Sequence, residues 1–273
     1  MPELPEVETL TVQLNRTLQG LKISQVEIRT PSILETPHEE FSAQVRARQI
    51  TQVKRRGKYI QVELSGNQCI WFHLGMTGQL LFAREKSIVS LAHIHFILSF
   101  AGIPEKIFYR DARRFGHIAL SPASRDQFPK GVRSLGLEPS DWKEEDFASF
   151  FRTRRARIKS LLLNQTLVAG LGNIYADESL YRAGIRPLRR AHQIGRDRLR
   201  LLHRAVCEVL EEAIEWGGSS IDDYLHLDGG VGKFQEFLKV YGRGGEKCGT
   251  CGSVIRRVKL SGRTSSFCPH CQK

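Results

Sequence analysis

The chain begins with the octet MPELPEVE, residues 1–8. The small Pro2 behind Met1 permits removal of the initiator, which would leave a proline as the first residue. Its secondary amine can attack an aldehyde-level carbon and form an iminium. An α-amino group has a reference pKa of about 7.7–8, so a useful fraction is neutral near pH 7. Glu3 adds an acid beside this nucleophile, and we expect the terminus to be accessible at the mouth of a positively charged cleft.

The same octet also starts a predicted helix. Pro5 suits a first helical turn, and apolar residues continue at helical spacing: Val7, Leu10, Leu14 and Leu18. The positive end of this helix would disfavour a protonated amine. A glutamate in a first turn is equally ordinary helix capping, so the octet alone leaves both interpretations open.

Composition points to a polyanionic partner. The 273 residues include 41 Lys and Arg against 29 Asp and Glu, a net charge of +12, with a pI near 9.7. This balance suits nucleic acid. No apolar run approaches the roughly 18 residues of a spanning helix, and the acidic start is unlike a signal peptide. We therefore expect an intracellular protein that is not attached to a membrane.

Strand and helix patterns divide the chain. Residues 21–120 show short alternating segments separated by turn residues, which indicate an antiparallel sandwich or barrel. From about residue 131 the pattern is helical, ending in a long amphipathic helix before Gly217-Gly218. That helix is rich in Arg in its first half, for which a polyanion near its start is one possible cause. Residues 219–239 lack periodicity and are predicted to form a mobile loop.

The strongest single motif lies in the tail. Two Cys-x-x-Cys pairs separated by sixteen residues have tetrahedral zinc spacing, and their ligands would be Cys248, Cys251, Cys268 and Cys271. Disulfides are disfavoured in a reducing compartment. Four cysteines leave no open coordination position, so the predicted zinc ion is structural. The segment between the pairs is a predicted hairpin turning at Ser261-Gly262, and its basic residues, Arg263 among them, are candidates for phosphate contacts.

Three other stretches suit nucleic acid. Gly170-Leu171-Gly172-Asn173 opening a helix resembles a phosphate cradle, although glycines before a helix are often only a turn. Arginines and a lysine precede it: Arg152, Arg154, Arg155, Arg157 and Lys159. Met76 lies in a loop between two glycines, and Arg113 and Phe115 lie in another. Exposed apolar wedges of this kind can fill the gap left by an extruded base, but each could also be a core residue at a strand end.

Taken together, these motifs resemble the bacterial formamidopyrimidine-DNA glycosylase family, also called 8-oxoguanine DNA glycosylases. The resemblance covers almost the whole chain through PELPEVE (2–8), RRGKY (55–59), HLGMTG (73–78), RRFG (113–116), AGLGNIYADE (169–178) and GRTSSFCPHC (262–271). It implies an α+β multidomain fold: an N-terminal antiparallel β-sandwich with an N-terminal helix (1–130), a helix–two-turn–helix domain with a lesion-capping loop (131–239), and a C-terminal zinc-finger hairpin with four cysteine ligands (240–273).

The resemblance also implies residue roles. Pro2 would be the nucleophile, Glu3 the acid for sugar-ring opening, and Glu6 its support. Lys58 would transfer protons in β-elimination and Arg263 would act in δ-elimination. The residues implied to grip the DNA backbone are His73, Lys159 and Asn173, with His93 and Arg154 further out. Met76, Arg113 and Phe115 would fill the void left by the flipped base. The implied substrate is double-stranded DNA with oxidised purines or abasic sites, and the implied enzyme is a monomer of the cytoplasm, associated with the nucleoid.

The chain departs from the family pattern in places. Ala112 stands where proline is frequent, and Ile94 follows His93 where aspartate is more usual, which weakens the assignment of His93. The stretch 83–106 is poorly matched. Two other functions remain open: an endonuclease VIII-type enzyme for oxidised pyrimidines, and a non-catalytic zinc-ribbon DNA-binding protein.

Overall fold

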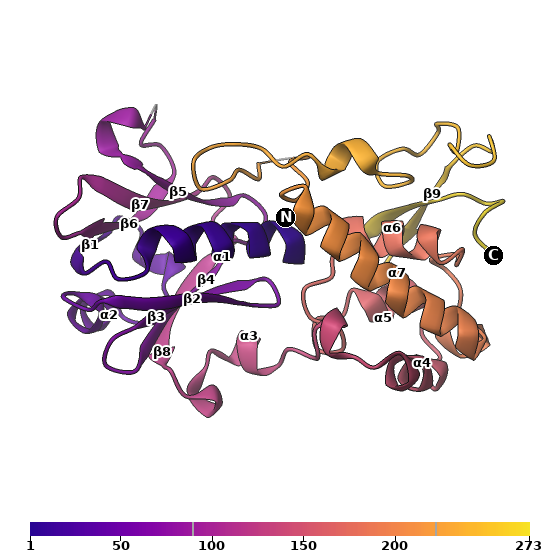
Figure 1. Cartoon of the computed structure of the whole chain (residues 1–273), viewed down its shortest axis with the longest axis horizontal. Helices are drawn as coiled ribbons and strands as arrows, with labels where there is room; N and C mark the ends of the chain where they lie inside the picture. Colours follow the sequence, from indigo (N-terminus) through magenta and orange to yellow (C-terminus); the bar gives the residue numbers. More distant parts are fainter. Residues whose placement is uncertain (89, 222) are drawn as a thin grey trace. The chain divides into compact units, whose positions relative to one another are not determined.

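The computed structural model describes residues 1–88, 90–221 and 223–273 (Figure 1). Val89, in the weakly matched stretch 83–106, and Asp222, in the predicted loop 219–239, lie outside the described residues. Contacts divide the chain into two compact units, which we describe separately. Unit 1 consists of Met1–Arg133 and Trp216–Gln235, and unit 2 consists of Ser134–Glu215 and Glu236–Lys273.

Unit 1 is a sandwich of two antiparallel sheets. One sheet has the order β1-β6-β7-β5 and the other the order β2-β3-β4-β8. The strands are β1 (Ile23–Ile28), β2 (Ile50–Arg56), β3 (Tyr59–Leu64), β4 (Gln68–His73), β5 (Gly78–Arg84), β6 (Ile94–Phe100), β7 (Glu105–Asp111) and β8 (His117–Pro122). Of the sandwich and barrel predicted from the strand pattern, the structure has the sandwich.

The core of unit 1 joins both sheets to the first helix. Helix α1 (Leu4–Leu18) buries Val7, Leu10 and Leu14 against side chains of both sheets, among them Ile60 and Phe96. Its apolar residues recur every three or four positions, so one face of the helix covers the core. Two short helices complete this part of the unit, α2 (His38–Val45) and α3 (Lys130–Arg133).

Unit 2 combines helices with a β-hairpin. Its helices are α4 (Glu144–Arg152), α5 (Ile158–Leu162), α6 (Asn173–Arg182) and α7 (Arg196–Glu215), and its hairpin is β9 (Arg256–Leu260) with β10 (Arg263–Phe267). Arg263 pairs with Leu260 next to the turn, and Phe267 pairs with Arg256 at the open end. The hairpin turn at Ser261-Gly262, where both residues have positive φ, is the one predicted from the sequence.

The segment Trp216–Gln235 groups with the sandwich and not with the helices. The backbone N–H of Phe82 in β5 donates to the carbonyl of Leu227 at 2.9 Å, and the N–H of Leu227 donates to the Gln13 side chain of α1 at 2.9 Å. The sequence had placed this segment within 131–239. The segment Trp216–Gln235 is therefore anchored on unit 1. The domain boundaries 1–130, 131–239 and 240–273 stay a prediction.

Candidate active site and metal centre

The start of α1 buries two carboxylates. Glu3 and Glu6 form a reciprocal capping box, in which the Glu3 backbone N–H donates to Glu6 Oε2 at 2.8 Å. This arrangement satisfies orphan donors at the helix start. Both side chains are buried, at 2% and 1% exposure. The octet therefore does cap the helix, and it places the predicted acid inside the unit.

Pro2 is buried in the structure, which retains Met1. Its nitrogen is then part of a peptide bond and cannot be a nucleophile. The accessibility of the terminus after removal of Met1 therefore stays a prediction. Removal of Met1, which is only partly buried, is the step that would make the Pro2 nitrogen an amine.

Glu6 ties α1 to the returning segment 216–235. The Ser219 backbone N–H donates to Glu6 Oε1 at 2.7 Å, and the Tyr224 hydroxyl donates to the Glu6 carbonyl at 3.2 Å. Gly218 has φ +81°, and a Cβ on it would lie 2.8 Å from Glu6 Oε1. Glycine is thus required at this close approach. The carboxylate of Glu6 holds two backbone segments together, next to Glu3.

Lys58 is the second residue of a two-residue hairpin turn between β2 and β3. Gly57, the first, has φ +57°, a conformation that favours glycine there. Lys58 itself is buried. Arg55 links this turn to α1, because its Nε donates to Glu8 Oε2 at 2.6 Å and its guanidinium also donates to the Gly57 carbonyl at 3.1 Å. The turn that carries Lys58 is therefore anchored to α1, one helical turn beyond Glu3.

Arg55 and Glu8 were not singled out from the sequence. Both lie within the quoted motifs RRGKY and PELPEVE, but neither carries chemistry, so only the tertiary contact identifies them. Their side chains are mostly buried, at 13% and 29% exposure. A partly buried ion pair of this kind fixes geometry more than an exposed pair would.

His73 lies in a cluster of rings at the end of the second sheet. It stacks on His117 with centroids 4.9 Å apart, and the tilted ring of Tyr59 lies 4.7 Å from it. Burial, His117 and Lys58 lower the pKa of His73 to about 3. The Gly75 backbone N–H donates to His73 Nδ1 at 3.3 Å, so the proton of the neutral ring is on Nε2. His73 can therefore offer a neutral hydrogen-bond donor, which suits a phosphate oxygen.

The two loops predicted to fill a void both present exposed side chains. Met76 is 41% and Phe115 54% exposed, so the alternative that they are core residues is wrong. The Arg113 guanidinium lies over the Phe115 ring at 4.6 Å. A Cβ on Gly75, at φ +59°, would lie 2.5 Å from the Gly116 nitrogen, so the loop backbones touch.

Asp111 organises these loops and was not assigned a role from the sequence. It is fully buried, and it accepts hydrogen bonds from the Thr77 hydroxyl, the Arg113 N–H at 3.2 Å and the Gly116 N–H at 2.8 Å. The Asp111 N–H donates to the carbonyl of His93 at 2.9 Å. His93 is exposed with φ +62°, so it stands at the edge of the same loop pair.

In unit 2 the predicted DNA contacts separate into two groups. Arg154 is exposed, with its guanidinium over the Phe150 ring at 4.2 Å. Lys159, by contrast, is completely buried. Its ammonium donates to Asp177 Oδ1 and to the Ser265 hydroxyl, both at 2.7 Å. The prediction that Lys159 contacts the DNA backbone is wrong for this structure, because its buried ammonium binds Asp177 and Ser265 inside unit 2.

The glycine-rich stretch before α6 is only partly available to an anion. The N–H of Gly170 already donates to Gln165 Oε1 at 2.9 Å. Asn173, the first residue of α6, is half-buried and its amide donates to the Thr264 carbonyl of β10 at 3.0 Å. Asn173 thus contacts the zinc-finger hairpin, at the helix end where an anion is favoured.

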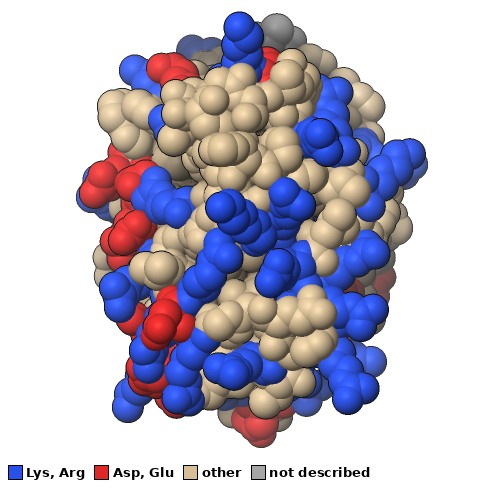
Figure 2. Space-filling model, turned by 90° about the vertical axis from the view of Figure 1, so that its right-hand side faces the viewer, with Lys and Arg blue, Asp and Glu red and all other residues tan. Residues whose placement is uncertain are grey.

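An exposed basic ribbon lies elsewhere in unit 2. Residues 154–158 run antiparallel to residues 189–192, and Arg157 pairs directly with Arg190. The same register puts Arg155 opposite His192, and all four side chains are exposed. Like charges directly opposite each other in a sheet are destabilising. Figure 2 shows how densely Lys and Arg side chains cover one face of the molecule.

Other arginines of unit 2 are neutralised internally. Arg204 in α7 forms a bidentate pair with Glu144 of α4 at 2.7 and 2.9 Å, and Arg200 pairs with Glu145. The acidic first turn of α4 therefore accounts for arginines in the first half of α7. A bound polyanion is not required to explain them. In the described parts of the chain, the basic ribbon has no such acidic partner among the ion pairs.

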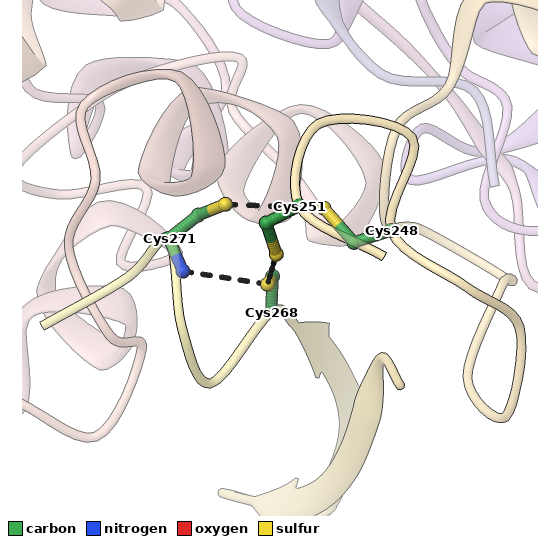
Figure 3. Close-up of side chains that lie close together, drawn as sticks. All are labelled: Cys248, Cys251, Cys268 and Cys271. Carbon is green, nitrogen blue, oxygen red and sulfur yellow. Dashed lines mark hydrogen bonds between the residues drawn. The ribbon is translucent and has the colours of Figure 1, made fainter. Parts of the chain in front are cut away.

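The four tail cysteines come together as a metal site (Figure 3). Their sulfur atoms all lie within 4.8 Å of one another, with Cys251 Sγ to Cys268 Sγ at 3.4 Å and Cys248 Sγ to Cys271 Sγ at 3.9 Å. These separations are too long for disulfides. Tetrahedral zinc with bonds of about 2.3 Å requires sulfur atoms roughly 3.8 Å apart, so the four residues fit the ion.

Three family models match the chain in succession. They are the formamidopyrimidine-DNA glycosylase N-terminal domain over residues 1–118, the formamidopyrimidine-DNA glycosylase H2TH domain over 135–224, and a zinc finger found in FPG and IleRS over 245–273. None of the helices in the described residues combines the length and apolarity that crossing a membrane requires.

Full-length relatives and solved structures agree. Formamidopyrimidine-DNA glycosylase of Solibacter usitatus is 46% identical, with 100% of both chains covered, and that of Moorella thermoacetica is 44% identical over 95% of both. A point mutant of Lactococcus lactis FPG in complex with Fapy-dG-containing DNA has a TM-score of 0.93 at 38% identity over 100% of both chains. Wild-type L. lactis FPG with an oxidised-pyrimidine-containing DNA has a TM-score of 0.91 at 37% identity, again over 100% of both. This chain belongs to the formamidopyrimidine-DNA glycosylase family.

Proposed function

We propose that this protein is a bifunctional DNA glycosylase and AP lyase of base excision repair that removes oxidised purines. The observation that carries the proposal is the anchoring of two motifs on one helix. Pro2 and Glu3 precede α1, and the Arg55–Glu8 pair ties the Lys58 turn to the same helix end. A nucleophile, an acid and a proton-transferring amine on one rigid scaffold are the groups that such chemistry requires.

The proposed reaction begins when removal of Met1 frees the Pro2 nitrogen. That amine bonds to C1′ of the extruded nucleotide, and the base departs with the glycosidic electron pair and a proton. Glu3 protonates the ring oxygen as the sugar opens, which leaves an iminium. The iminium acidifies the C2′ hydrogen, Lys58 takes part in the proton transfers, and the 3′ phosphate leaves by β-elimination. Arg263 assists the loss of the 5′ phosphate by δ-elimination.

The remaining assignments are proposed from exposure and chemistry. His73 donates from Nε2 to a phosphate, while Asn173, His93 and Arg154 contact the backbone around it. Met76, Arg113 and Phe115 fill the space left by the extruded base, since Met76 and Phe115 are exposed on two loops whose backbones touch, and the Arg113 guanidinium lies over the Phe115 ring. Lys159 is not among the proposed phosphate contacts.

One structural zinc ion held by Cys248, Cys251, Cys268 and Cys271 completes the proposal. The ion would cross-link the two ends of the hairpin segment. Four thiolate ligands leave it no position for water, so it supplies structure and no bond-making step.

The decisive experiment is borohydride trapping on duplex DNA with an abasic site or an oxidised base. The wild-type chain, with Met1 removal checked by mass spectrometry, should form a covalent adduct that is lost in Pro2→Gly. Pro5→Ala is the matched control, because it alters a proline of the same octet without touching the nucleophile. Absence of an adduct in the wild type would support the non-catalytic zinc-ribbon alternative. Faster excision of oxidised pyrimidines than of oxidised purines would support the endonuclease VIII-type alternative.

A further inference from the structure

Helix α6 holds the zinc-finger segment through three polar side chains. Asn173 binds the Thr264 carbonyl, as described above. Asp177 Oδ2 accepts the Ser266 backbone N–H at 2.9 Å. Glu178 accepts three successive backbone N–H groups, those of residues 239, 240 and 241, at 2.8 to 2.9 Å. The motif AGLGNIYADE therefore grips both the entry to the zinc finger and its second strand.

Lys159 completes this grip from α5. Its side chain and that of Asp177 are 0% and 1% exposed, and Nζ to Oδ1 is 2.7 Å. The same ammonium donates to Ser265 Oγ at 2.7 Å. Burying two charges is costly unless they are paired and further hydrogen-bonded. The extra bonds here go to adjacent residues of β10, so a shift of that strand would leave buried charges with fewer partners.

Ser265 and Ser266 lie two and three residues after Arg263 in β10. At about 3.3 Å per residue, the anchor is less than roughly 10 Å from Arg263 along the strand. The metal site holds β10 at its other end, where Cys268 follows Phe267. Metal coordination alone would leave the turn end of the hairpin, with the exposed Arg263, free to swing.

We propose that Lys159 and Asp177 are positioning residues for Arg263. Their buried pair sets the register of β10 against α6 and so places the Arg263 guanidinium for its proposed part in δ-elimination. The inference rests on the proposed function of Arg263. The proposal predicts that loss of the Lys159–Asp177 pair impairs δ-elimination and leaves β-elimination intact. The reason is that the Lys58 turn, which serves β-elimination, is anchored within unit 1.

The test measures the ratio of β- to β,δ-elimination products on abasic DNA by denaturing electrophoresis. Misplacement of a catalytic group by about 1 Å can cost up to roughly a hundredfold in rate. Asp177→Asn should raise the β to β,δ ratio at least about tenfold and approach the ratio of Arg263→Gln, with base excision unchanged. Asp146→Asn, the same chemical change at an exposed site of α4, is the control and should leave the ratio at the wild-type value.

Two further variants separate positioning from stability. Asp177→Asn leaves the Lys159 charge buried and can lower stability, whereas Lys159→Met with Asp177→Leu removes both charges and should melt near the wild-type temperature. The double variant should still accumulate β product, because the bonds of Lys159 and Asp177 to β10 are gone and, from α6, only the Asn173 amide still binds that strand. Ser265→Ala, which removes one bond, should give an intermediate ratio. Unchanged ratios in folded, zinc-loaded variants would overturn the proposal.

A wild-type chain that yields only β product would contradict the δ-elimination role of Arg263. The positioning proposal can then be tested through DNA affinity. In that case the affinity for abasic DNA is measured in a double-mutant cycle of Arg263→Gln with the Lys159→Met, Asp177→Leu pair. Positioning predicts that Arg263→Gln has a smaller effect when the pair is absent. Additive effects would overturn the proposal.

Discussion

Helix α1 of unit 1 and helix α6 of unit 2 each use a buried carboxylate to bind backbone N–H groups, but the two carboxylates serve different parts of the molecule. In α1, Glu6 accepts the backbone N–H groups of Glu3 and Ser219. In α6, Glu178 accepts those of residues 239–241. Each helix therefore carries a buried glutamate that fastens a chain segment returning from far along the sequence.

The two helices differ in what lies next to that glutamate. Beside Glu6 is Glu3, the proposed acid, and then the proposed nucleophile. Beside Glu178 is Asp177, which a buried lysine neutralises. In unit 2 the acid next to the clamping glutamate is therefore paired with a buried lysine, whereas in unit 1 the acid in that place is the proposed catalytic group. Five experiments test this contrast.

The largest effect is expected from loss of the metal. Cys268→Ser should abolish stoichiometric zinc binding and unfold the hairpin that α6 holds, since a structural zinc contributes about 10–16 kcal/mol in isolated finger peptides. Zinc content by elemental analysis and hydrogen exchange of residues 245–273 are the measurements. Ser266→Thr keeps the backbone N–H that binds Asp177 and serves as a control. Full protection of the finger without zinc would contradict the structural role.

A large kinetic effect is expected from the turn anchored on α1. Lys58→Gln should slow strand cleavage by about 10²–10⁴-fold, the usual contribution of a positioned acid or base. Lys54→Gln is the control, because Lys54 lies in β2, the strand that leads into the Lys58 turn, and pairs with Glu63 on the surface at 2.8 Å. Single-turnover cleavage of abasic DNA measures both. Equal rates for Lys58→Gln and wild type would remove Lys58 from the mechanism.

The two clamping glutamates can be compared directly. Glu6→Gln and Glu178→Gln each present an amide NH2 group where a backbone N–H now donates, at a cost of about 1–3 kcal/mol each. Urea unfolding measures this cost. We expect Glu6→Gln also to slow base excision, because Glu6 holds Glu3, while Glu178→Gln affects the finger only. Excision that is slowed equally in the two variants would show that the contrast between the helices is false.

The two units should respond to pH in opposite directions. The folded pKa of His73 lies near 3, below its ordinary value of 6.5, so its contribution to stability is present above pH 6.5 and is lost as pH falls. Burial raises the pKa of Asp177 to about 6 despite the Lys159 charge, so its contribution is largest below pH 4 and is lost as pH rises through 6. Hydrogen exchange between pH 4.5 and 7 measures each unit.

In that experiment His73→Gln should flatten the pH response of unit 1, and Asp177→Asn that of unit 2. The slopes cannot exceed about 1.4 kcal/mol per pH unit for one group. Variant slopes equal to those of the wild type would show that other groups dominate.

The smallest effect concerns the basic ribbon. Arg157→Gln with Arg190→Gln should lower the salt dependence of DNA binding, by about 0.9 in slope for each phosphate that is no longer neutralised. Arg204→Gln is the control, because its guanidinium is already paired with Glu144. Titrations of duplex DNA at several salt concentrations give the slopes. A slope change in the control alone would place the DNA contacts on α7.

Much of the architecture could be predicted from local patterns. Helix α1, the strands β2–β4 and β6–β8, the helices α4–α7 and the zinc hairpin all follow from periodicity, glycine turns and cysteine spacing. Helix α2 was missed, because residues 21–120 gave a strand pattern and this short helix is fixed mainly by burial of Phe41 and Val45. Local propensity is too weak to identify an element that tertiary packing stabilises.

The candidate site shows the same division. The cysteines, Lys58 and the exposed Met76 and Phe115 were found by motif and loop position. Asp111, Arg55 and Glu8 were not, since a residue that acts through another leaves no chemical pattern of its own. The resemblance implied that Lys159 contacts the DNA backbone, whereas its side chain is buried and pairs with Asp177.

The sequence alone shows which groups are present: a proline at position 2, four cysteines with zinc spacing, and an excess of positive charge. Which of those charges are paired follows from the tertiary contacts. Arg157 and Arg190 keep theirs on the surface, whereas Lys159 and Arg204 lose theirs to carboxylates far away in the chain. The residue type alone fixes the charge of a side chain, because the charge comes from its chemical group. The partner of that charge depends on which segments fold against each other.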